Sequence, residues 1–220
     1  MQANSRPVSS SQLWTHPKLP ALVHRHLAQP WRKPVADFNR AAFAELEAAL
    51  QSRSRPLLLD SFCGTGQSTA TLAQQYPQHL VVGIDKSAQR LQRHVAGGGG
   101  NYLLLRAECE AIWQLLLERR WRPERHYLLY PNPWPKPGHL QRRIHGHASF
   151  PLLLQLGGRV ELRSNWQVYV EEFGLAMHLA GRRGQVERIP GEPPPLTLFE
   201  DKYRKSGHAL WRYQGRAQGV

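Results

Sequence analysis

The segment LLLDSFCGTG at residues 57–66 joins a short apolar run to a turn with two glycines, and a helical stretch follows at residues 66–75. In an open α/β sheet, ligands bind beyond the carboxyl ends of the strands, where glycine lets the backbone approach a nucleotide-like ligand closely. We therefore predict a ligand-binding turn at Gly64 and Gly66. A plain tight turn is the alternative, because two glycines after a strand are a weak signal on their own.

Apolar runs of strand length alternate with helical stretches along the chain. The predicted strands are residues 57–59, 80–84, 102–105, 127–130 and 160–162. The predicted helices are residues 38–50 (with Asp37 as the cap), 66–75, 88–95, 110–119, 148–156 and 166–179. Such alternation predicts an α/β fold, a Rossmann-like, doubly wound and mostly parallel sheet with helices on both faces.

The first 55 residues differ in composition from the remainder. Residues 1–12 are polar and rich in serine, which is typical of disorder, and residues 13–34 mix Trp, His, Arg and Pro without a sustained period. We interpret residues 1–55 as an N-terminal arm with a leading helix, and residues 56–220 as the functional domain. A chain of 220 residues leaves little room for a second core.

Charge and cysteine content narrow the classes of function. With 29 Lys and Arg against 16 Asp and Glu, the net charge is +13, which favours a polyanion such as nucleic acid as partner. A protein that is merely basic and soluble is the alternative. No segment approaches the roughly 20 apolar residues that span a bilayer, and Cys63 and Cys109 suit neither a disulfide framework nor a thiolate metal site. We expect a cytoplasmic monomer that binds no metal and no membrane.

Acidic residues follow the second and third predicted strands. Asp85 could accept hydrogen bonds from the two ribose hydroxyls of a nucleoside, although a helix N-cap is the alternative role. Glu108 could reach an adenine amino group, or could be a solvated acid at a helix start. A dinucleotide fingerprint would need a third glycine where this chain has Thr69, so NAD is disfavoured.

The segment YPNPWPK at residues 130–136, followed by His139, Arg142 and Arg143, resembles the signature of the tRNA (guanine-N(7))-methyltransferase family. Members of that family read PDPWPK with a basic run behind it. The segments LRSNW at residues 162–166 and PLTLFE at residues 195–200 resemble two further elements of the family, in the same order. The resemblance covers roughly residues 57–211 and leaves the N-terminal arm uncovered.

This resemblance implies a class I methyltransferase fold with a last antiparallel strand near residues 209–213, S-adenosylmethionine as methyl donor and tRNA as acceptor. The residues that it assigns to the cofactor are Asp60, Gly64, Gly66, Asp85, Glu108 and Asn132. Those that it assigns to the target base and its chemistry are Asn132, Trp134, Lys136, Asn165, Thr197 and Glu200.

Three positions depart from the family pattern. Phe62 stands where the family usually has glycine, and Asn132 and Asn165 stand where it has aspartate. Attack by guanine N(7) leaves a cationic purine, so a carboxylate nearby would stabilise the product. A full charge at about 4 Å is worth on the order of 4 kcal/mol at an effective dielectric near 20. The loss could disable this chemistry unless Glu200 supplies the charge.

The triplet Asn132-Pro133-Trp134 also resembles the Asn-Pro-Pro-aromatic element of enzymes that methylate exocyclic amines. An amide and a carbonyl would there accept hydrogen bonds from an amino group, and the aromatic ring would stack on the base. Methylation of an exocyclic base amine is therefore one alternative function, and a catalytically weak RNA-binding paralogue is the other. Trp134 could also be a core aromatic between two prolines.

A run of basic side chains lies just past this segment. Phosphate contacts from such a set would hold tRNA on the surface without reading its sequence, whereas a solvated loop is the alternative. The run contains two histidines at close spacing, but no carboxylate or cysteine stands near them, so we predict no metal site. Its members are Lys136, His139, Arg142, Arg143, His145 and His147.

Overall fold

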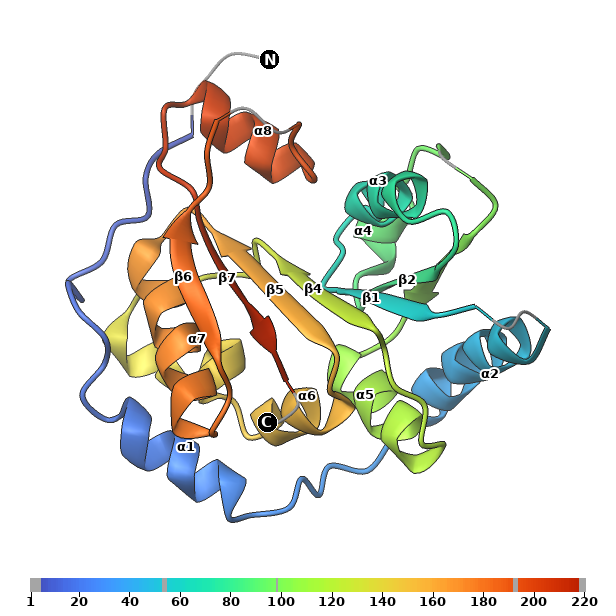
Figure 1. Ribbon diagram of the computed structural model, residues 1–220, viewed down its shortest axis with the longest axis horizontal. Coiled ribbons are helices and arrows are strands. Elements are labelled where there is room, and N and C mark those ends of the chain that lie inside the picture. The colour runs from blue at the N-terminus through green and yellow to red at the C-terminus, as the bar shows by residue number, and fades with distance from the viewer. Residues whose placement is uncertain (1–4, 53–54, 98, 192–193, 218–220) are drawn as a thin grey trace.

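A single seven-stranded sheet organises the part of the chain that the structure describes (Figure 1). The computed structural model describes residues 5–52, 55–97, 99–191 and 194–217. The strand order is β3-β2-β1-β4-β5-β7-β6, so the order reverses direction between β1 and β4. The strands are β1 (Leu57–Ser61), β2 (Leu80–Asp85), β3 (Tyr102–Arg106), β4 (Arg125–Leu129), β5 (Arg159–Ser164), β6 (Gly184–Arg188) and β7 (Trp211–Arg216).

Strands β3, β2, β1, β4 and β5 are mutually parallel, whereas β7 is antiparallel to both β5 and β6. The α/β class, the doubly wound parallel sheet and the last antiparallel strand are therefore confirmed. The five strands predicted from apolar runs correspond to β1 to β5, with ends that differ by a few residues. The short strand β6 was missed because its sequence, GQVER, has a single apolar residue.

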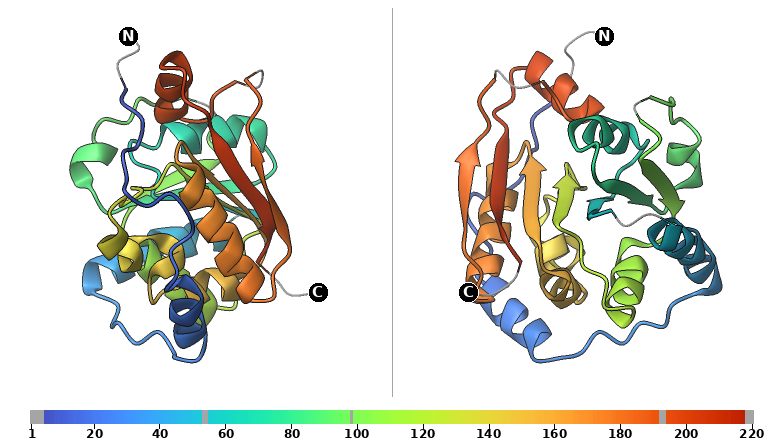
Figure 2. Two further views of the ribbon diagram at one scale, coloured as in Figure 1. Left: turned by 90° about the vertical axis from the view of Figure 1, so that its left-hand side faces the viewer. Right: turned by 45° about the vertical axis from the view of Figure 1, so that its right-hand side comes forward.

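Helices cover both faces of this sheet, as Figure 2 shows from two sides. In β1, Leu57 and Leu59 belong to the core cluster that includes residues of α1, α2, α5, α6 and α7, whereas Leu58 packs on the other face with Leu72 of α3. Side chains that alternate between two apolar faces require cover on both. The helices are α1 (Leu19–Leu27), α2 (Asp37–Ser52), α3 (Gln67–Gln75), α4 (Ala88–Leu91), α5 (Cys109–Glu118), α6 (Phe150–Leu156), α7 (Gln167–Leu179) and α8 (Leu198–Lys205).

The predicted helices correspond to α2 to α7, although α4 ends at Leu91 rather than at residue 95. Two α-helices were missed, as were two 3₁₀ helices, η1 (Pro137–Arg142) and η2 (Ile144–Gly146). The stretch at residues 13–34, interpreted as lacking a period, contains α1, whose Leu19, Leu22 and Val23 are buried in the main core. This interpretation was wrong because nine residues are too few for a clear helical period. Helix α8 was missed because its sequence, LFEDKYRK, is mostly charged.

The segment before α1, from Ser5 to Lys18, is the extended part of the predicted arm, and we call it the N-terminal arm from here on. It runs along the side of the molecule that carries α7, from the neighbourhood of α8 to the start of α1 (Figures 1 and 2). Ser5 bonds Ser206, and Ser10 donates to the carbonyl of Pro135 at 2.6 Å. The expectation of disorder over residues 1–12 was therefore wrong for residues 5–12, because distant backbone groups provide partners that the local sequence does not reveal. Residues 1–4 lie outside the described residues.

Candidate active site

A cavity of about 850 Å³ opens beyond the carboxyl ends of β1 and β4, where the strand order reverses. Ligands of doubly wound sheets bind at this position. Its wall comes from the turn between β1 and α3, the loop after β4 and the start of α8. The structure therefore brings the predicted glycine turn and the segment at residues 130–136 into one cavity.

The turn after β1 adopts left-handed backbone angles at three positions. Gly64 and Gly66 have φ of 63° and 75°, and a Cβ on Gly66 would lie 2.7 Å from the Leu104 methyl groups. Phe62, which stands where the family has glycine, also has a positive φ of 64°. Its ring packs edge-on against Trp113 at 6.1 Å between centroids. The turn keeps the backbone shape of a glycine at this position, at the cost of strain.

Asp60 is fully buried beneath this turn. Its Oδ2 accepts hydrogen bonds from Ser68 at 2.6 Å and Thr69 at 2.7 Å, and Ser68 lines the cavity. The other oxygen, Oδ1, is buried without a partner among the described residues. Burial raises the pKa of Asp60 to about 6, although the two hydroxyl donors oppose this change. An acceptor of this kind is suited to a cationic donor.

Asp85, at the end of β2, is also buried, and both of its oxygens are occupied. Oδ2 accepts the backbone N–H of Gly64 at 3.0 Å, and Oδ1 accepts that of Ser87 at 2.8 Å. Arg90 forms an ion pair with Oδ1 at 3.0 Å, and its side chain is 50% exposed. Asp85 therefore shapes the glycine turn, and Arg90 would have to turn away before Oδ1 could accept a ribose hydroxyl.

Glu108 occupies the N-cap position of α5 without a capping hydrogen bond from its side chain, and it does not line the cavity. Lys33 donates to both of its oxygens at 2.8 Å, and Asn39 donates to Oε2 at 3.3 Å. The hydrogen bond from Lys33 is the main cause of the lowered pKa of Glu108. The acid that does line the cavity from this helix is Glu110, two residues later, which the sequence analysis did not single out.

The loop after β4, which we call the proline loop (residues 131–137), has proline at every second position. Asn132 and Trp134 line the cavity, and the Asn132 amide oxygen accepts the backbone N–H of Trp134 at 3.4 Å. Trp134 has a positive φ of 46°. Its ring stacks with the Arg142 guanidinium at 4.8 Å and contacts the His139 ring edge-on at 5.5 Å. Trp134 is thus a wall of the cavity rather than a core aromatic.

The basic run behind this loop divides into exposed and buried members. Lys136 and Arg142 are exposed, and His139 is half-buried. Arg143 and His145 have no exposed surface, because both bond the buried carboxylate of Glu172. The expectation that Arg143 and His145 contact tRNA phosphates is corrected, since an ion-paired side chain inside the protein cannot reach a surface ligand. His147 is half-buried, lines the cavity and bonds Ser149.

Glu200 is fully buried in α8 and carries two ion pairs. Arg163 donates to Oε2 at 2.9 Å, and Arg204 donates to Oε1 at 2.6 Å. Thr197 caps the helix by accepting the backbone N–H of Glu200 at 2.9 Å. The expectation that Glu200 lines the base pocket and supplies the missing charge is corrected, because two guanidinium groups already neutralise it. Thr197 itself lines the cavity.

Two further predicted residues lie away from the cavity wall. The Asn165 amide nitrogen lies 3.3 Å from Nδ1 of His208, and the carbonyl of Lys136 accepts a hydrogen bond from Arg143 at 3.3 Å. The structure thus brings together Gly64, Asn132, Trp134, Arg142 and Thr197 around one cavity, with Asp60, Gly66 and Asp85 next to the glycine turn but outside the cavity lining.

The cavity also has lining residues that the sequence analysis missed. The pattern TLFE at residues 197–200 is a capping box, which signals a helix start and could have revealed α8. No comparable sequence signal marks the other lining residues. Cations predominate among them, which agrees with the net charge of +13. The missed charged and aromatic residues include Lys86, Arg90, Arg93, Glu110, Trp113, Phe199, Asp201, Lys202 and Lys205.

Within the described residues, no group of three His, Cys, Asp or Glu side chains could hold a metal ion, and no helix is long and apolar enough to cross a membrane. Cys63 and Cys109 are buried free thiols.

Comparison with solved structures supports the fold. The chain superimposes on an antibiotic-related methyltransferase with a TM-score of 0.57, at 16% identity over 84% of this chain and 96% of that one. For the 16S rRNA methyltransferase KamB, the TM-score is 0.56, at 20% identity over 84% and 94% of the two chains. At such identities the likeness concerns the fold alone, and the expected class I methyltransferase fold is confirmed.

Sequence comparison finds curated relatives named tRNA (guanine-N(7)-)-methyltransferase. The relative from Zymomonas mobilis is 28% identical over 178 residues, which cover 74% of this chain and 75% of the relative. The relative from Thermus thermophilus is 30% identical over 206 residues, which cover 90% of this chain and 58% of the relative. A family described as "Putative methyltransferase" matches residues 54–213. Because this match spans well over half of the chain, the protein belongs to this methyltransferase family.

Proposed function

We propose that the protein is an S-adenosylmethionine-dependent methyltransferase that forms 7-methylguanosine in tRNA. The observation that carries this proposal is the single cavity that joins the glycine turn after β1 to Asn132 and Trp134 of the proline loop. A methyl donor on the turn and a base on the loop would face each other across it. The names of the curated relatives support the reaction and the substrate.

The turn fits the proposed cofactor. A Cβ on Gly64 would meet nothing within 4 Å, so the backbone there is open to a ligand. The buried Asp60 lies outside the cavity lining, so its unpartnered Oδ1 would have to become exposed before it could accept the ammonium group of a methionine moiety. When bound, S-adenosylmethionine supplies a methyl group on a sulfonium. A nucleophile in line with the carbon–sulfur bond would take this methyl group, and the thioether would leave. The protein therefore needs to position two reactants rather than to form a covalent bond with either.

The opposite wall fits an RNA base. Trp134 and the exposed Phe199 offer aromatic faces on which a base outside the helical stack can lie. Cations surround the opening and suit the flanking phosphates, which hold RNA without reading its sequence. In the proposed role they are Lys86, Arg93, Arg142, Lys202 and Lys205, all on the wall. Arg142 thus keeps the phosphate role that buried Arg143 cannot have.

The charge next to the base is the point on which the reaction depends. Guanine N(7) carries no proton, so the attack needs no general base, but it leaves a positive charge on the purine. Asn132 offers only an amide dipole, and Glu200 is neutralised by its two arginines. Two acids, Glu110 and Asp201, line the cavity, but Asp201 is already paired with Lys205 at 2.7 Å. We propose Glu110 as the acid that offsets the forming charge.

The test is a single-turnover methyl transfer to bulk tRNA by the wild type and Asn132→Asp, with the modified nucleoside identified by mass and retention. A carboxylate at residue 132 should raise the rate, by up to about a thousandfold if it acts at full strength at about 4 Å. Gln141→Glu adds a carboxylate elsewhere on the same wall and serves as the matched control. It should change the rate far less.

The other outcomes identify the alternatives. An unchanged rate with a product methylated off the ring would indicate an exocyclic base amine as the target, because a carboxylate and an amide oxygen both accept its hydrogen bond. No product from either protein, despite tight binding of S-adenosylmethionine and tRNA, would indicate a catalytically weak RNA-binding paralogue. A slower Asn132→Asp enzyme that still makes 7-methylguanosine would refute the charge argument.

We further propose that the protein works as a monomer in the cytoplasm and binds no metal, with residues 56–220 as the catalytic domain. The reduced, buried thiols of Cys63 and Cys109 are consistent with a reducing compartment. Helices α1 and α2, from the first 55 residues, share the main core with that domain.

A further inference from the structure

The proline loop has few backbone donors with which to hold its own shape. Its prolines, at positions 131, 133, 135 and 137, have no N–H to donate. Trp134, between two of them, has a left-handed φ of 46°, a conformation that a bulky side chain rarely adopts. A strained segment persists only when its surroundings determine it, so the donors that hold this loop must come from elsewhere.

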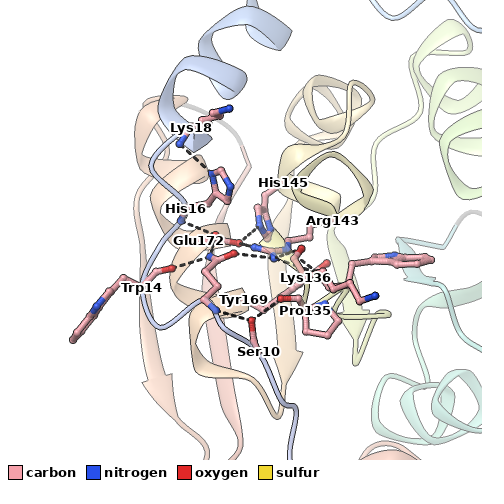
Figure 3. A network of polar contacts seen from close by, with 12 residues as sticks. Ser10, Trp14, His16, Lys18, Pro135, Lys136, Arg143, His145, Tyr169 and Glu172 are labelled. Carbon is pink, nitrogen blue, oxygen red and sulfur yellow. Dashed lines mark hydrogen bonds and ion pairs between the residues drawn. The ribbon is translucent and has the colours of Figure 1, made fainter. Parts of the chain in front are cut away.

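Three consecutive carbonyls of the loop receive such donors. The Arg143 guanidinium donates to the carbonyl of Trp134 at 3.2 Å and to that of Lys136 at 3.3 Å. Between them, the hydroxyl of Ser10 in the N-terminal arm donates to the carbonyl of Pro135 at 2.6 Å. Figure 3 shows these contacts converging from the arm and from the segment after the loop. The loop is thus held from behind at residues 134–136.

The guanidinium is itself fixed by α7 and the arm. Nη1 of Arg143 donates to Oε2 of the buried Glu172 at 2.6 Å, and Nη2 donates to Oε1 of Gln12 at 3.0 Å. Gln12 in turn donates to Oε1 of Glu172 at 2.6 Å, as does the backbone N–H of His16 at 2.8 Å. His145 occupies the remaining side of Oε2 at 2.9 Å. Arm, loop and helix therefore share one network (Figure 3).

We propose that residues 10–16 form a strap that positions the proline loop for methyl transfer, with Ser10 and Gln12 as its positioning residues. The proposal rests on the proposed function in one respect, that Trp134 and Asn132 face the target base. Neither Ser10 nor Gln12 lines the cavity, so each acts on the loop from behind. Loss of either contact should therefore lower kcat while leaving the affinity for S-adenosylmethionine, held on the other wall, unchanged.

Steady-state kinetics with tRNA test this split between positioning and binding. Ser10→Ala and Gln12→Ala should each lower kcat about tenfold, with the Kd for S-adenosylmethionine near that of the wild type. Ser10→Ala removes no partner of the buried ion pair and should also keep the midpoint of thermal unfolding, whereas Gln12→Ala should lower that midpoint. Ser10→Thr keeps the hydroxyl and should recover most of the rate. The matched control is Ser11→Ala, since the neighbouring Ser11 is exposed and should change nothing. A kcat within twofold of the control in both variants would overturn the proposal.

A second readout does not depend on activity. With 5-fluorotryptophan incorporated, the ¹⁹F resonance of Trp134 can be assigned by its loss in Trp134→Phe. Ser10→Ala should shift or broaden this resonance more than those of the six other tryptophans in the chain, whereas Ser11→Ala should leave it in place. An unmoved Trp134 resonance in Ser10→Ala refutes the strap even if the enzyme is active. A moved resonance in a protein that methylates no tRNA upholds the strap and refutes the proposed function.

Discussion

The two loops that face each other across the cavity are stabilised in opposite ways. In the turn after β1, the N–H of Cys63 donates to the carbonyl of Ile84 at 3.1 Å, and the N–H of Gly66 donates to the carbonyl of Cys63 at 3.0 Å. The N–H of Gly64 donates to the carboxylate of Asp85 at 3.0 Å. All of these partners belong to the turn or to the adjacent strand β2. The proline loop is held instead by Arg143 and by Ser10, which is 125 residues away in sequence.

This difference indicates how each loop maintains its strained backbone angles. Both loops contain non-glycine residues with positive φ, namely Phe62 in the turn and Trp134 in the proline loop. The turn resists strain because its own backbone and the neighbouring strand close it. The proline loop has few donors of its own, so its shape depends on a buried ion pair and on the arm. We therefore expect remote substitutions to affect the proline loop most, and the turn to respond to local ones.

The largest effect should come from the buried ion pair behind the proline loop. Glu172→Gln leaves Arg143 buried without a countercharge and should lower the free energy of unfolding by about 3 to 5 kcal/mol. Glu171→Gln, one residue earlier, removes a carboxylate whose partner is the exposed Gln167 and should cost less than about 0.5 kcal/mol. Denaturant unfolding of both variants measures the difference. An equal loss of unfolding free energy in the two variants would mean that the proline loop does not depend on the ion pair between Arg143 and Glu172.

Acid should weaken the same network. Burial alone would raise the pKa of Glu172, but the hydrogen bond from His145 and the charge of Arg143 lower it from 4.5 to about 2. Because the folded pKa lies below the unfolded one, this stabilisation is complete above about pH 4.5 and is lost as pH falls toward about 2. The change corresponds to about 3 kcal/mol.

Urea unfolding between pH 6 and the acid range measures this loss as the difference between the wild type and Glu172→Gln. That difference should shrink as the pH falls, since a glutamine at position 172 does not titrate. The comparison cancels the opposite contribution of Asp60, whose raised pKa is shared by both proteins. A difference that stays constant with pH would contradict the assignment of a low pKa to Glu172.

On the other wall, Asp85→Ala should weaken S-adenosylmethionine binding by about 1 to 3 kcal/mol. The substitution removes the acceptor that holds the Gly64 N–H, and thus disturbs the turn locally. Asp37→Ala, at the exposed start of α2, is the control and should leave the affinity unchanged. Titration calorimetry of both variants gives the two Kd values. If they agree, Asp85 has no part in the cofactor site.

The smallest effect concerns the strain at Phe62. Phe62→Gly and Phe62→Ala both lose the contact with Trp113, but only alanine keeps the disfavoured positive φ. The glycine variant should therefore be the more stable of the two by about 1 kcal/mol, although glycine normally costs more conformational entropy on folding. Thermal unfolding compares them. The reverse order would mean that the turn relaxes when the ring is removed.

The strands of the sheet and most helices could be predicted from the sequence because each is a local pattern. In β1 the leucines at positions 57, 58 and 59 make both faces apolar, and several of the following helices have regular apolar spacing. Helix α1 and the ordered arm could not be predicted in this way. Nine residues carry little period, and the backbone of the arm is ordered by partners such as Glu172 and Pro135 that lie far away in sequence.

The candidate site shows the same division residue by residue. The positions of Gly64, Asn132 and Trp134 on the cavity wall agree with the motifs that singled them out. Arg142 and Arg143 are adjacent and identical in type, yet one is exposed and the other buried. No local signal distinguishes them, because the difference arises from Glu172 on α7.

The sequence by itself determined the sheet, the glycine turn and the family, since these depend on residue order and on interactions between near neighbours. Only the tertiary structure decided which charges remain available for function. Glu200 is neutralised by Arg163 and Arg204, and Glu172 by Arg143. The physical reason is that a charge removed from water must be paired, and which residue provides the partner depends on how distant segments pack.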